Sequence, residues 1–190
     1  MPEIRLHRTG PQSGLWRFAE ADENFGNPYW AHHWGGGLAL ARHALDHPEA
    51  VADKRVLDLG AGSGLVAIAA AMAGASHVLA VDVDPYAIVA TEVNAAANGV
   101  AVATLRGDLT GETPPDVDVV LVGDLFYEAE LAKRVTGFLD RCLAAGIGVL
   151  IGDPWRAHLP RGRLKLLAEY PGGDFGDGDA LKLNAVFAFK

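Results

Sequence analysis

The sequence predicts an α/β fold: an open, doubly wound and mostly parallel sheet with an antiparallel strand at one edge. The first observation is that short apolar runs rich in β-branched residues alternate with helix-like segments along most of the 190-residue chain. Such runs suit strands that are buried on both faces, as a parallel sheet requires. The second observation is that the final segment, "LKLNAVFAF", alternates apolar and polar residues after a turn-rich stretch. Two successive strands joined in that way cannot be parallel neighbours.

The individual elements follow from the same patterns. Apolar runs predict strands at 55–59, 77–83, 102–106, 117–123 and 147–152, and the alternating segment predicts a last strand at 181–189. Helix-like segments lie at 65–73, 85–97, 128–144 and 161–169, and a further helix is expected ahead of the first strand within "LALARHALDHPEAV". A chain of this length suits a single domain. We divide it into an N-terminal arm and helix, residues 1–50, packed on a core formed by residues 51–190.

The composition is that of an acidic globular protein, with a net charge of −8 and scattered lysines and arginines. Nucleic-acid binding is not expected, because no basic patch matches a phosphate backbone. An acidic protein suits small molecules or basic protein partners, since its field attracts cations. No apolar run approaches the ~20 residues of a membrane span. The N-terminal sequence lacks the features of a targeting segment, so a cytoplasmic protein is expected.

Cysteine and histidine usage predicts no metal site. Cys142 is the only cysteine, which excludes an internal disulfide and a cysteine-based zinc site. It falls near the end of an expected helix, where a buried structural thiol is the simplest reading. His32 and His33 are adjacent, so their side chains diverge on a helix or a strand.

The stretch "VLDLGAGSG" places a glycine loop between the first strand and the next helix. Gly60, Gly62 and Gly64 follow the spacing G-x-G-x-G, whereas a dinucleotide fingerprint reads G-x-G-x-x-G. Asp58, two residues ahead of the loop, would repel a pyrophosphate at the helix N-terminus by on the order of a kcal/mol. The same carboxylate would attract a cation. S-adenosylmethionine fits, because its amine and sulfonium are positive while its carboxylate would use the loop amides; a simple tight turn is the alternative.

The second and third strands end in further acids. Asp82, at the tip of the second strand, would accept hydrogen bonds from both ribose hydroxyls of a nucleoside, although NAD would use it identically. Val83 would present an apolar wall to the base. Asp84 is expected to cap the next helix, with a proline at its first position. Asp108, in the "GDL" after the third strand, would accept from the exocyclic amine of adenine; solvated turn acids are the alternative for Asp82 and Asp108.

The fourth strand ends in "GDLFYE", which brings candidate chemistry to the rim of the pocket. Methyl transfer needs near-attack geometry and an unprotonated nucleophile. A lysine amine has a pKa of about 10.4 in water, and desolvation beside a sulfonium favours its neutral form. We predict that the Asp124 carboxylate orients the amine and that Tyr127 shapes the channel. The alternative is that Asp124 caps the following helix.

Two further residues complete the expected cofactor site. Gly123 ends the fourth strand beside these groups. Trp34 leads into three consecutive glycines, Gly35 to Gly37, which allow the backbone to approach a ligand closely.

With these residues in view, the sequence resembles the seven-strand class I methyltransferases with a Rossmann-like fold. Within them it resembles, as a bacterial member, the lysine methyltransferase family that acts on the electron transfer flavoprotein β-subunit. The resemblance runs from Tyr29 to the C-terminus and rests on "YWAHHWGGGLAL", "VLDLGAGSG", "AGASHVLAVDVDP", "GDLFY" and "VLIGDP". One departure is Gly35, where relatives often have proline.

The resemblance implies a seven-stranded sheet and methylation of lysines near the partner-docking loop of that flavoprotein. It implies a cofactor pocket formed by Asp58, Gly60, Asp82 and the Trp34 region, with Asp124 to Tyr127 as the D-x-x-Y substrate motif. Two alternatives stay open: a ribosomal-protein or small-amine N-methyltransferase, and a non-catalytic relative that binds the cofactor. A monomer is expected, and neither the modified lysines nor the number of methyl groups follows from the sequence.

Overall fold

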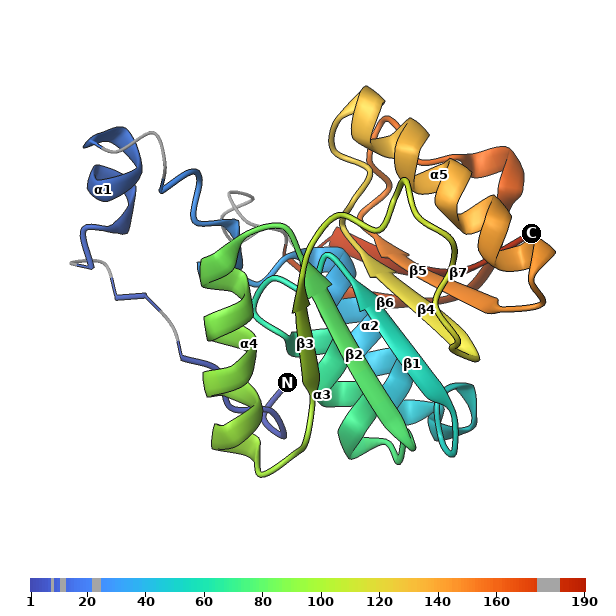
Figure 1. Cartoon of the computed structure of the whole chain (residues 1–190), viewed down its shortest axis with the longest axis horizontal. Coiled ribbons are helices and arrows are strands. Elements are labelled where there is room, and N and C mark those ends of the chain that lie inside the picture. Colours follow the sequence, from blue (N-terminus) through green and yellow to red (C-terminus); the bar gives the residue numbers. More distant parts are fainter. Residues whose placement is uncertain (8, 11–12, 22–24, 174–181) are drawn as a thin grey trace.

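A computed structural model describes residues 1–7, 9–10, 13–21, 25–173 and 182–190. Within them, seven strands form one sheet in the order β3-β2-β1-β4-β5-β7-β6 (Figure 1). The strands are β1 (Arg55–Leu59), β2 (His77–Asp82), β3 (Ala103–Arg106), β4 (Val119–Gly123), β5 (Gly148–Asp153), β6 (Leu164–Gly172) and β7 (Lys182–Phe189). The pairs from β3 to β5 are parallel, whereas β7 is antiparallel to β5 and β6. The expected seven-stranded, mostly parallel sheet is confirmed, and its antiparallel strand lies one place in from the edge.

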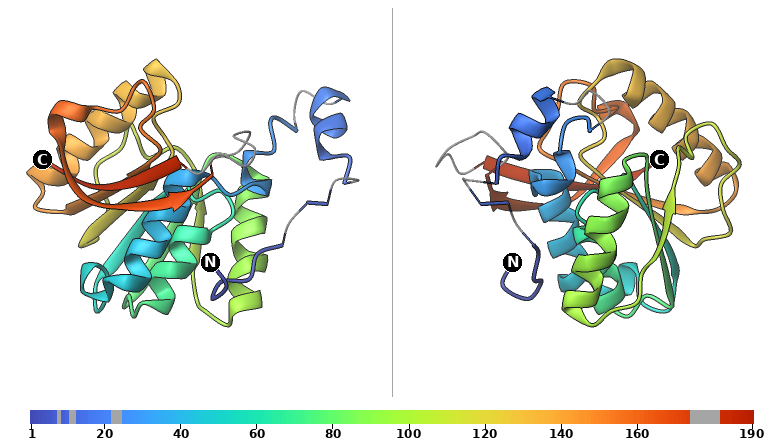
Figure 2. Two further views of the ribbon diagram at one scale, coloured as in Figure 1. Left: turned by 180° about the vertical axis from the view of Figure 1, so that it is seen from behind. Right: turned by 60° about the vertical axis from the view of Figure 1, so that its left-hand side comes forward.

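Helices cover both faces of this sheet (Figures 1 and 2). The α-helices of the described residues are α1 (Leu15–Ala21), α2 (Gly35–Asp46), α3 (Leu65–Met72), α4 (Pro85–Asn98) and α5 (Ala129–Ala144). Short 3-10 turns lie at Tyr29–Ala31, Pro48–Ala50 and Arg161–Arg163. The helices α2, α3 and α4 pack on one face, and α5 packs on the other. None of the described helices combines the length and apolar character needed to cross a membrane.

The helices on both faces of the sheet explain the continuous apolar runs of the sequence. In β1, Val56 belongs to the core on the α2 and α3 side, whereas Leu57 belongs to the core on the α5 side. In β4, Leu121 and Val120 divide in the same way. A strand with both faces buried needs apolar residues at successive positions, so its sequence does not alternate. The predicted strands at 55–59 to 147–152 accordingly overlap β1 to β5, with ends that differ by at most two residues.

The helix predicted at 161–169 is wrong. A 3-10 turn at Arg161–Arg163 leads into the edge strand β6. This strand pairs with β7 from Leu164 opposite Phe189 to Gly172 opposite Lys182, which supplies the backbone hydrogen bonds that a helix would have made internally. The leucines of this segment do not form the buried stripe of a helix, because Leu166 and Leu167 are 46% and 40% exposed. Most of the turn-rich stretch before β7 lies outside the described residues.

The N-terminal segment meets the core at two places. The backbone amides of Arg5 and His7 donate hydrogen bonds to Asn98 and Asn94 of α4 at 2.9 and 2.8 Å. The helix α2 packs on α3 and on the sheet, whereas α1 stands apart from the sheet in Figure 1 and in the left view of Figure 2. The predicted cap of α4 is confirmed: Asp84 accepts from the Tyr86 amide at 2.7 Å, with Pro85 at the first helical position.

Glycines press the first turn of α2 against the ends of β4 and β5. A Cβ on Gly36 would collide with the carbonyl oxygen of Gly152, and a Cβ on Gly152 would collide with that of Gly36. A Cβ on Gly123 would lie 3.1 Å from the Cα of Gly37. The "GGG" run therefore serves close contact between two main chains, which no other residue permits.

Replacing Gly36 by alanine should lower the free energy of unfolding by about 1–3 kcal/mol, because the new methyl group must displace the backbone of β5. Urea unfolding followed by circular dichroism measures the change. Gly137→Ala is the matched control: its Cβ meets only Arg141, at 3.9 Å, within α5. There the substitution should stabilise by about 0.5–1 kcal/mol. A Gly36→Ala protein as stable as the wild type would contradict the contact.

Candidate active site

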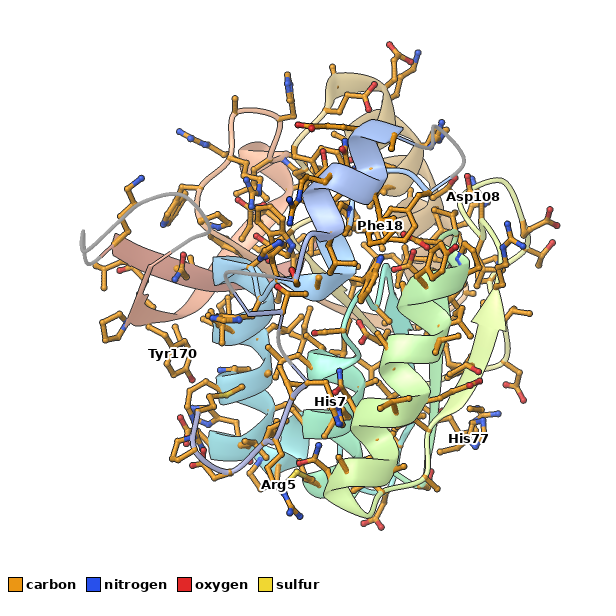
Figure 3. All side chains as sticks on the ribbon, turned by 90° about the vertical axis from the view of Figure 1, so that its left-hand side faces the viewer. Arg5, His7, Phe18, His77, Asp108 and Tyr170 are labelled. Atoms are coloured by element: carbon orange, nitrogen blue, oxygen red, sulfur yellow. The ribbon has the colours of Figure 1, made fainter. Side chains whose placement is uncertain are left out.

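A cavity of about 580 Å³ opens at the carboxyl ends of the parallel strands. Four aspartates gather at this edge: Asp58 within β1, Asp82 at the end of β2, Asp124 directly after β4 and Asp153 at the end of β5. They meet because parallel strands all end on the same side of a sheet, where open α/β folds bind ligands. In Figure 3, Asp108, in the loop after β3, lies well above His77, where β2 begins, so the carboxyl ends of these strands point upward in that view.

Most residues that the sequence predicted for the site line this cavity. They are Trp34, Asp58, Gly60, Gly62, Asp82, Val83, Asp108, Gly123, Asp124 and Tyr127. Gly64 is outside the lining. It is the N-cap of α3, in a left-handed conformation, and a Cβ there would lie 2.8 Å from the Thr91 side chain of α4. Its contact is therefore one of helix packing.

The amides of the glycine loop are engaged within the protein. Gly60 and Ala61 both donate to the carbonyl oxygen of Val81, and Gly64 donates to Ala61. The Gly62 amide donates to Asp82 Oδ2 at 2.9 Å. A phosphate nest needs several such amides turned toward the ligand. The expectation that a ligand carboxylate would use them is therefore not met at these four residues, and a pyrophosphate would have no cradle there either.

Asp58 is a buried carboxyl at the base of the cavity, 1% exposed. Its Oδ2 accepts a hydrogen bond of 2.9 Å from the Ala67 amide in the first turn of α3. Burial raises the pKa of Asp58 to about 7, an effect opposed by that amide and increased by the charge of Asp82. A cation in the cavity would favour the ionised form, so this carboxyl suits a positively charged ligand.

Asp82 is held in place by backbone amides on two sides. Besides the Gly62 bond, its Oδ1 accepts from the Asp84 amide at 3.0 Å. Burial raises the pKa of Asp82, and the two amide bonds oppose the rise. The alternative of a solvated loop acid does not describe this side chain. Val83 beside it is 62% exposed and lines the cavity.

Asp108 makes the contacts of a turn acid. It accepts from the amide and the hydroxyl of Thr110 at 2.8 and 2.6 Å. The hydroxyl bond lowers the pKa of Asp108, and the Arg134 guanidinium, 3.8 Å away, adds to this effect. The side chain also lines the cavity, so the turn role and a ligand role remain compatible.

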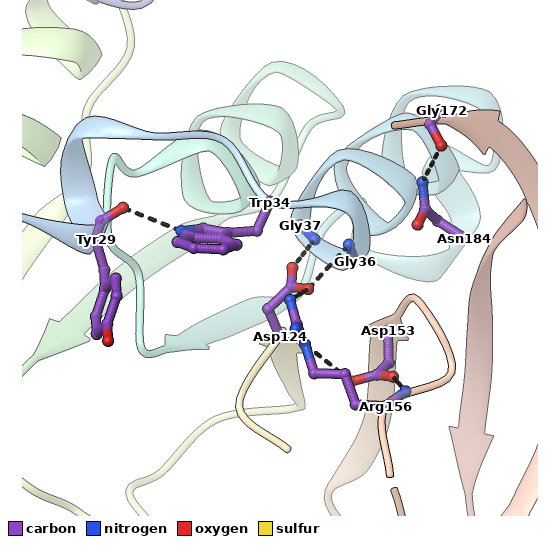
Figure 4. A network of polar contacts seen from close by, with 9 residues as sticks. All are labelled: Tyr29, Trp34, Gly36, Gly37, Asp124, Asp153, Arg156, Gly172 and Asn184. Carbon is purple, nitrogen blue, oxygen red and sulfur yellow. Dashed lines mark hydrogen bonds and ion pairs between the residues drawn. The ribbon is translucent and has the colours of Figure 1, made fainter. Parts of the chain in front are cut away.

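The Asp124 carboxylate binds the first turn of α2 (Figure 4). Its Oδ1 and Oδ2 accept from the amides of Gly36 and Gly37 at 3.2 and 2.6 Å. The residue takes a left-handed backbone conformation, with φ of 60°, and is 8% exposed. The idea that it caps the helix after β4 is wrong: Glu128 occupies the N-cap of α5, and the helix that Asp124 serves is 87 residues earlier.

Sequence reasoning missed the partner of Asp124. The Arg156 guanidinium donates to Asp124 Oδ1 at 2.9 Å and lies 5.8 Å from the centre of the Trp34 ring. Its backbone amide donates to Asp153 at 2.6 Å, which places the side chain between the ends of β4 and β5. Asp153 could have been found from the sequence, because it is an acid at the end of an expected strand. No sequence pattern points to Arg156, because its pairing with Asp124 depends on which strands are neighbours.

Aromatic side chains flank this acidic end. The Trp34 indole donates to the carbonyl oxygen of Tyr29 at 3.0 Å, and the two rings meet edge to face at 5.7 Å. The Tyr29 ring lies 6.1 Å from that of Tyr127. Tyr127 is 51% exposed, and burial of its hydroxyl raises the pKa. Trp30 stacks on Tyr86 and also lines the cavity.

The fold and sequence match methyltransferases. A family model described as "Ribosomal protein L11 methyltransferase (PrmA)" matches residues 38–126. Magnesium protoporphyrin IX methyltransferase from Synechocystis PCC 6803, solved with bound SAM, is 14% identical, with a TM-score of 0.61 over 98% of this chain and 88% of that one. That likeness shows the fold.

Two curated relatives are much more similar. The "Electron transfer flavoprotein beta subunit lysine methyltransferase" of Xenopus laevis is 43% identical over 175 residues, which are 89% of this chain and 71% of the frog protein. The rat protein of the same name is 41% identical over 197 aligned positions, with 99% of this chain and 77% of its own length covered. On this identity and coverage, the chain belongs to the electron transfer flavoprotein β-subunit lysine methyltransferase family, within the class I methyltransferases.

Proposed function

We propose that the protein is an S-adenosylmethionine-dependent protein-lysine N-methyltransferase that modifies lysines of the electron transfer flavoprotein β-subunit. The observation that carries the proposal is the position of Asp124. It lies in a cavity lined by acids, beside the aromatic rings of Trp34 and Tyr127, in a chain of this family. A carboxylate next to aromatic surface suits the cationic head and the apolar stem of a lysine.

The residues of the cavity fit the proposed cofactor. Asp58 and Asp82 bring negative charge to the glycine loop, and the loop amides are engaged within the protein, which favours a cation over a phosphate. Asp82 would hold the ribose hydroxyls and Val83 would contact the base. Trp30 Nε1 is buried with no hydrogen-bond partner among the described residues. When bound, the cofactor supplies an electrophilic methyl group on a positively charged sulfur.

The acceptor end would orient and dehydrate a lysine. Asp124 is fixed by the two α2 amides and by Arg156, so its carboxylate presents a rigid acceptor for an N–H bond. The rings of Tyr29, Trp34 and Tyr127 would exclude water from the stem. Holding the amine in near-attack geometry accounts for much of the rate enhancement that such a site provides.

Other expectations extend the proposal. The net charge of −8 suits a partner whose target segment is basic. A cytoplasmic location, a monomeric state and the lack of nucleic-acid binding stay predictions from the sequence.

The proposal is tested by incubating the purified protein with tritiated S-adenosylmethionine and three separate acceptors: the flavoprotein β-subunit, ribosomal protein L11 and a small alkylamine. We expect label on the β-subunit. Asp124→Asn should lower turnover at least 100-fold while cofactor affinity stays within a few-fold, because it removes the carboxylate charge but keeps the shape. Glu169→Gln, an exposed acid on β6, is the matched control. Label on L11 or on the amine alone would replace the proposed substrate, and a fully active Asp124→Asn enzyme would refute the role of Asp124.

Asp82→Ala should weaken the binding of S-adenosylmethionine by about 1–3 kcal/mol, the value of a hydrogen bond to a charged group. Titration calorimetry measures the affinity. Asp108→Ala provides the comparison, and its effect should be smaller because Asp108 already satisfies Thr110. Equal affinities of the wild type and the Asp82 variant would exclude a ribose contact.

Cofactor binding at pH 7 should release roughly half a proton, because a bound cation lowers the pKa of Asp58 from about 7. Affinity should therefore rise as the pH increases from about 6 to 8. Calorimetry in two buffers of different ionisation enthalpy gives the number of protons released. Asp58→Asn should abolish most of this release, and an unchanged release would assign it to another group.

A further inference from the structure

Arg156 occupies the acceptor end of the cavity between two acids. Figure 4 shows its side chain reaching from Asp153 toward Asp124. The side chains of Arg156, Asp124 and Asp153 are 20%, 10% and 0% exposed, so this charged cluster is largely removed from water. The guanidinium also lies over the Trp34 ring. A buried ion pair of this kind is held in one geometry by its surroundings.

This position has a consequence for any amine directed at Asp124. A bare carboxylate in a water-poor cavity binds an ammonium ion and stabilises its proton, which opposes nucleophilic attack. A guanidinium on the same carboxylate offsets that charge. The amine can then hydrogen-bond to Asp124 while the local field favours its neutral form.

Besides Arg156, two histidines and one arginine of the cavity lining can carry a positive charge. The titratable groups of this lining other than Arg156 and Asp124 are Tyr29, His32, His33, Asp58, Asp82, Asp84, Asp108, Tyr127, Glu128 and Arg134. Burial lowers the pKa of His32, which disfavours its cation. Arg134 is paired with Asp108 at 3.8 Å. Burial raises the pKa of Asp153 to about 7, and the nearby Asp124 charge adds to the rise.

We propose that Arg156 is a positioning residue of the methyl transfer, which fixes the ionised Asp124 and offsets its charge so that the acceptor lysine reacts as a neutral amine. The inference rests on the proposed function. The lysine first loses a proton to water. Its nitrogen then forms a bond to the methyl carbon as the carbon–sulfur bond breaks, with the electron pair staying on sulfur, and the methylated ammonium afterwards releases a second proton.

The test is the pH profile of kcat between pH 6 and 10 at saturating β-subunit, because kcat reports the groups of the bound complex. In Arg156→Gln the acidic limb should move up by about one pH unit, which lowers kcat about tenfold at pH 7 and much less at pH 9.5. Arg156→Lys keeps the charge and should restore the wild-type midpoint. Arg161→Gln is the matched control, because Arg161 stacks on Trp155. Its profile should match the wild type.

A merely structural role would lower kcat equally at every pH, and that result would overturn the inference. So would a profile of Arg156→Gln that superimposes on the wild type. Cofactor affinity and the thermal midpoint, measured on all variants, should stay close to the wild type in Arg156→Lys.

A second measurement needs no acceptor. The carbon-13 shift of the Asp124 carboxyl, followed against pH, should show protonation at a higher pH in Arg156→Gln than in the wild type. Identical titrations would overturn the inference even in an enzyme that methylates the β-subunit. Wild-type protein that labels no acceptor would overturn the proposed function instead, and the carboxyl titration would still decide the role of Arg156.

Discussion

The contact between the Asp124 carboxylate and the first turn of α2 is the interaction on which the acceptor end of the site depends. Two backbone amides, from Gly36 and Gly37, bind the two oxygens of one side chain that lies 87–88 residues later in the chain. A helix N-terminus carries partial positive charge, so the carboxylate is favoured there. The same contact ties the segment ahead of the first strand to the end of β4. Trp34 and Arg156 take their places around that junction.

Backbone amides also stabilise Asp58 and Asp82, but they do not fully offset the cost of burying these carboxyls. Asp58 accepts from the first turn of α3, and Asp82 accepts from two loop amides. Burial still raises the pKa of both groups. Placing several carboxyls at one edge of a sheet is unfavourable by itself, because each loses hydration and repels its neighbours. A positively charged ligand relieves both costs, so this arrangement of carboxyls favours a cation.

Local patterns account for what could be predicted from the sequence. The strands β1 to β5 were recognisable because burial on both faces imposes continuous apolar runs, and the acids followed from the strand ends. The edge strand β6 was missed, because exposed leucines near a bulge imitate helical spacing. The contacts of Asp124 with the first turn of α2 and with Arg156 were also missed. Both contacts depend on which strands become neighbours, and no local sequence pattern carries that information.

The main-chain contact between Gly36 and Gly152 also bears on how such an enzyme diversifies. Since neither residue tolerates a side chain, the junction that holds Asp124 cannot be reshaped by substitution at these two positions, and any relative that keeps the junction keeps the same placement of the carboxylate. Adaptation to new acceptors is left to exposed residues that line the cavity beside Asp124, such as Tyr127.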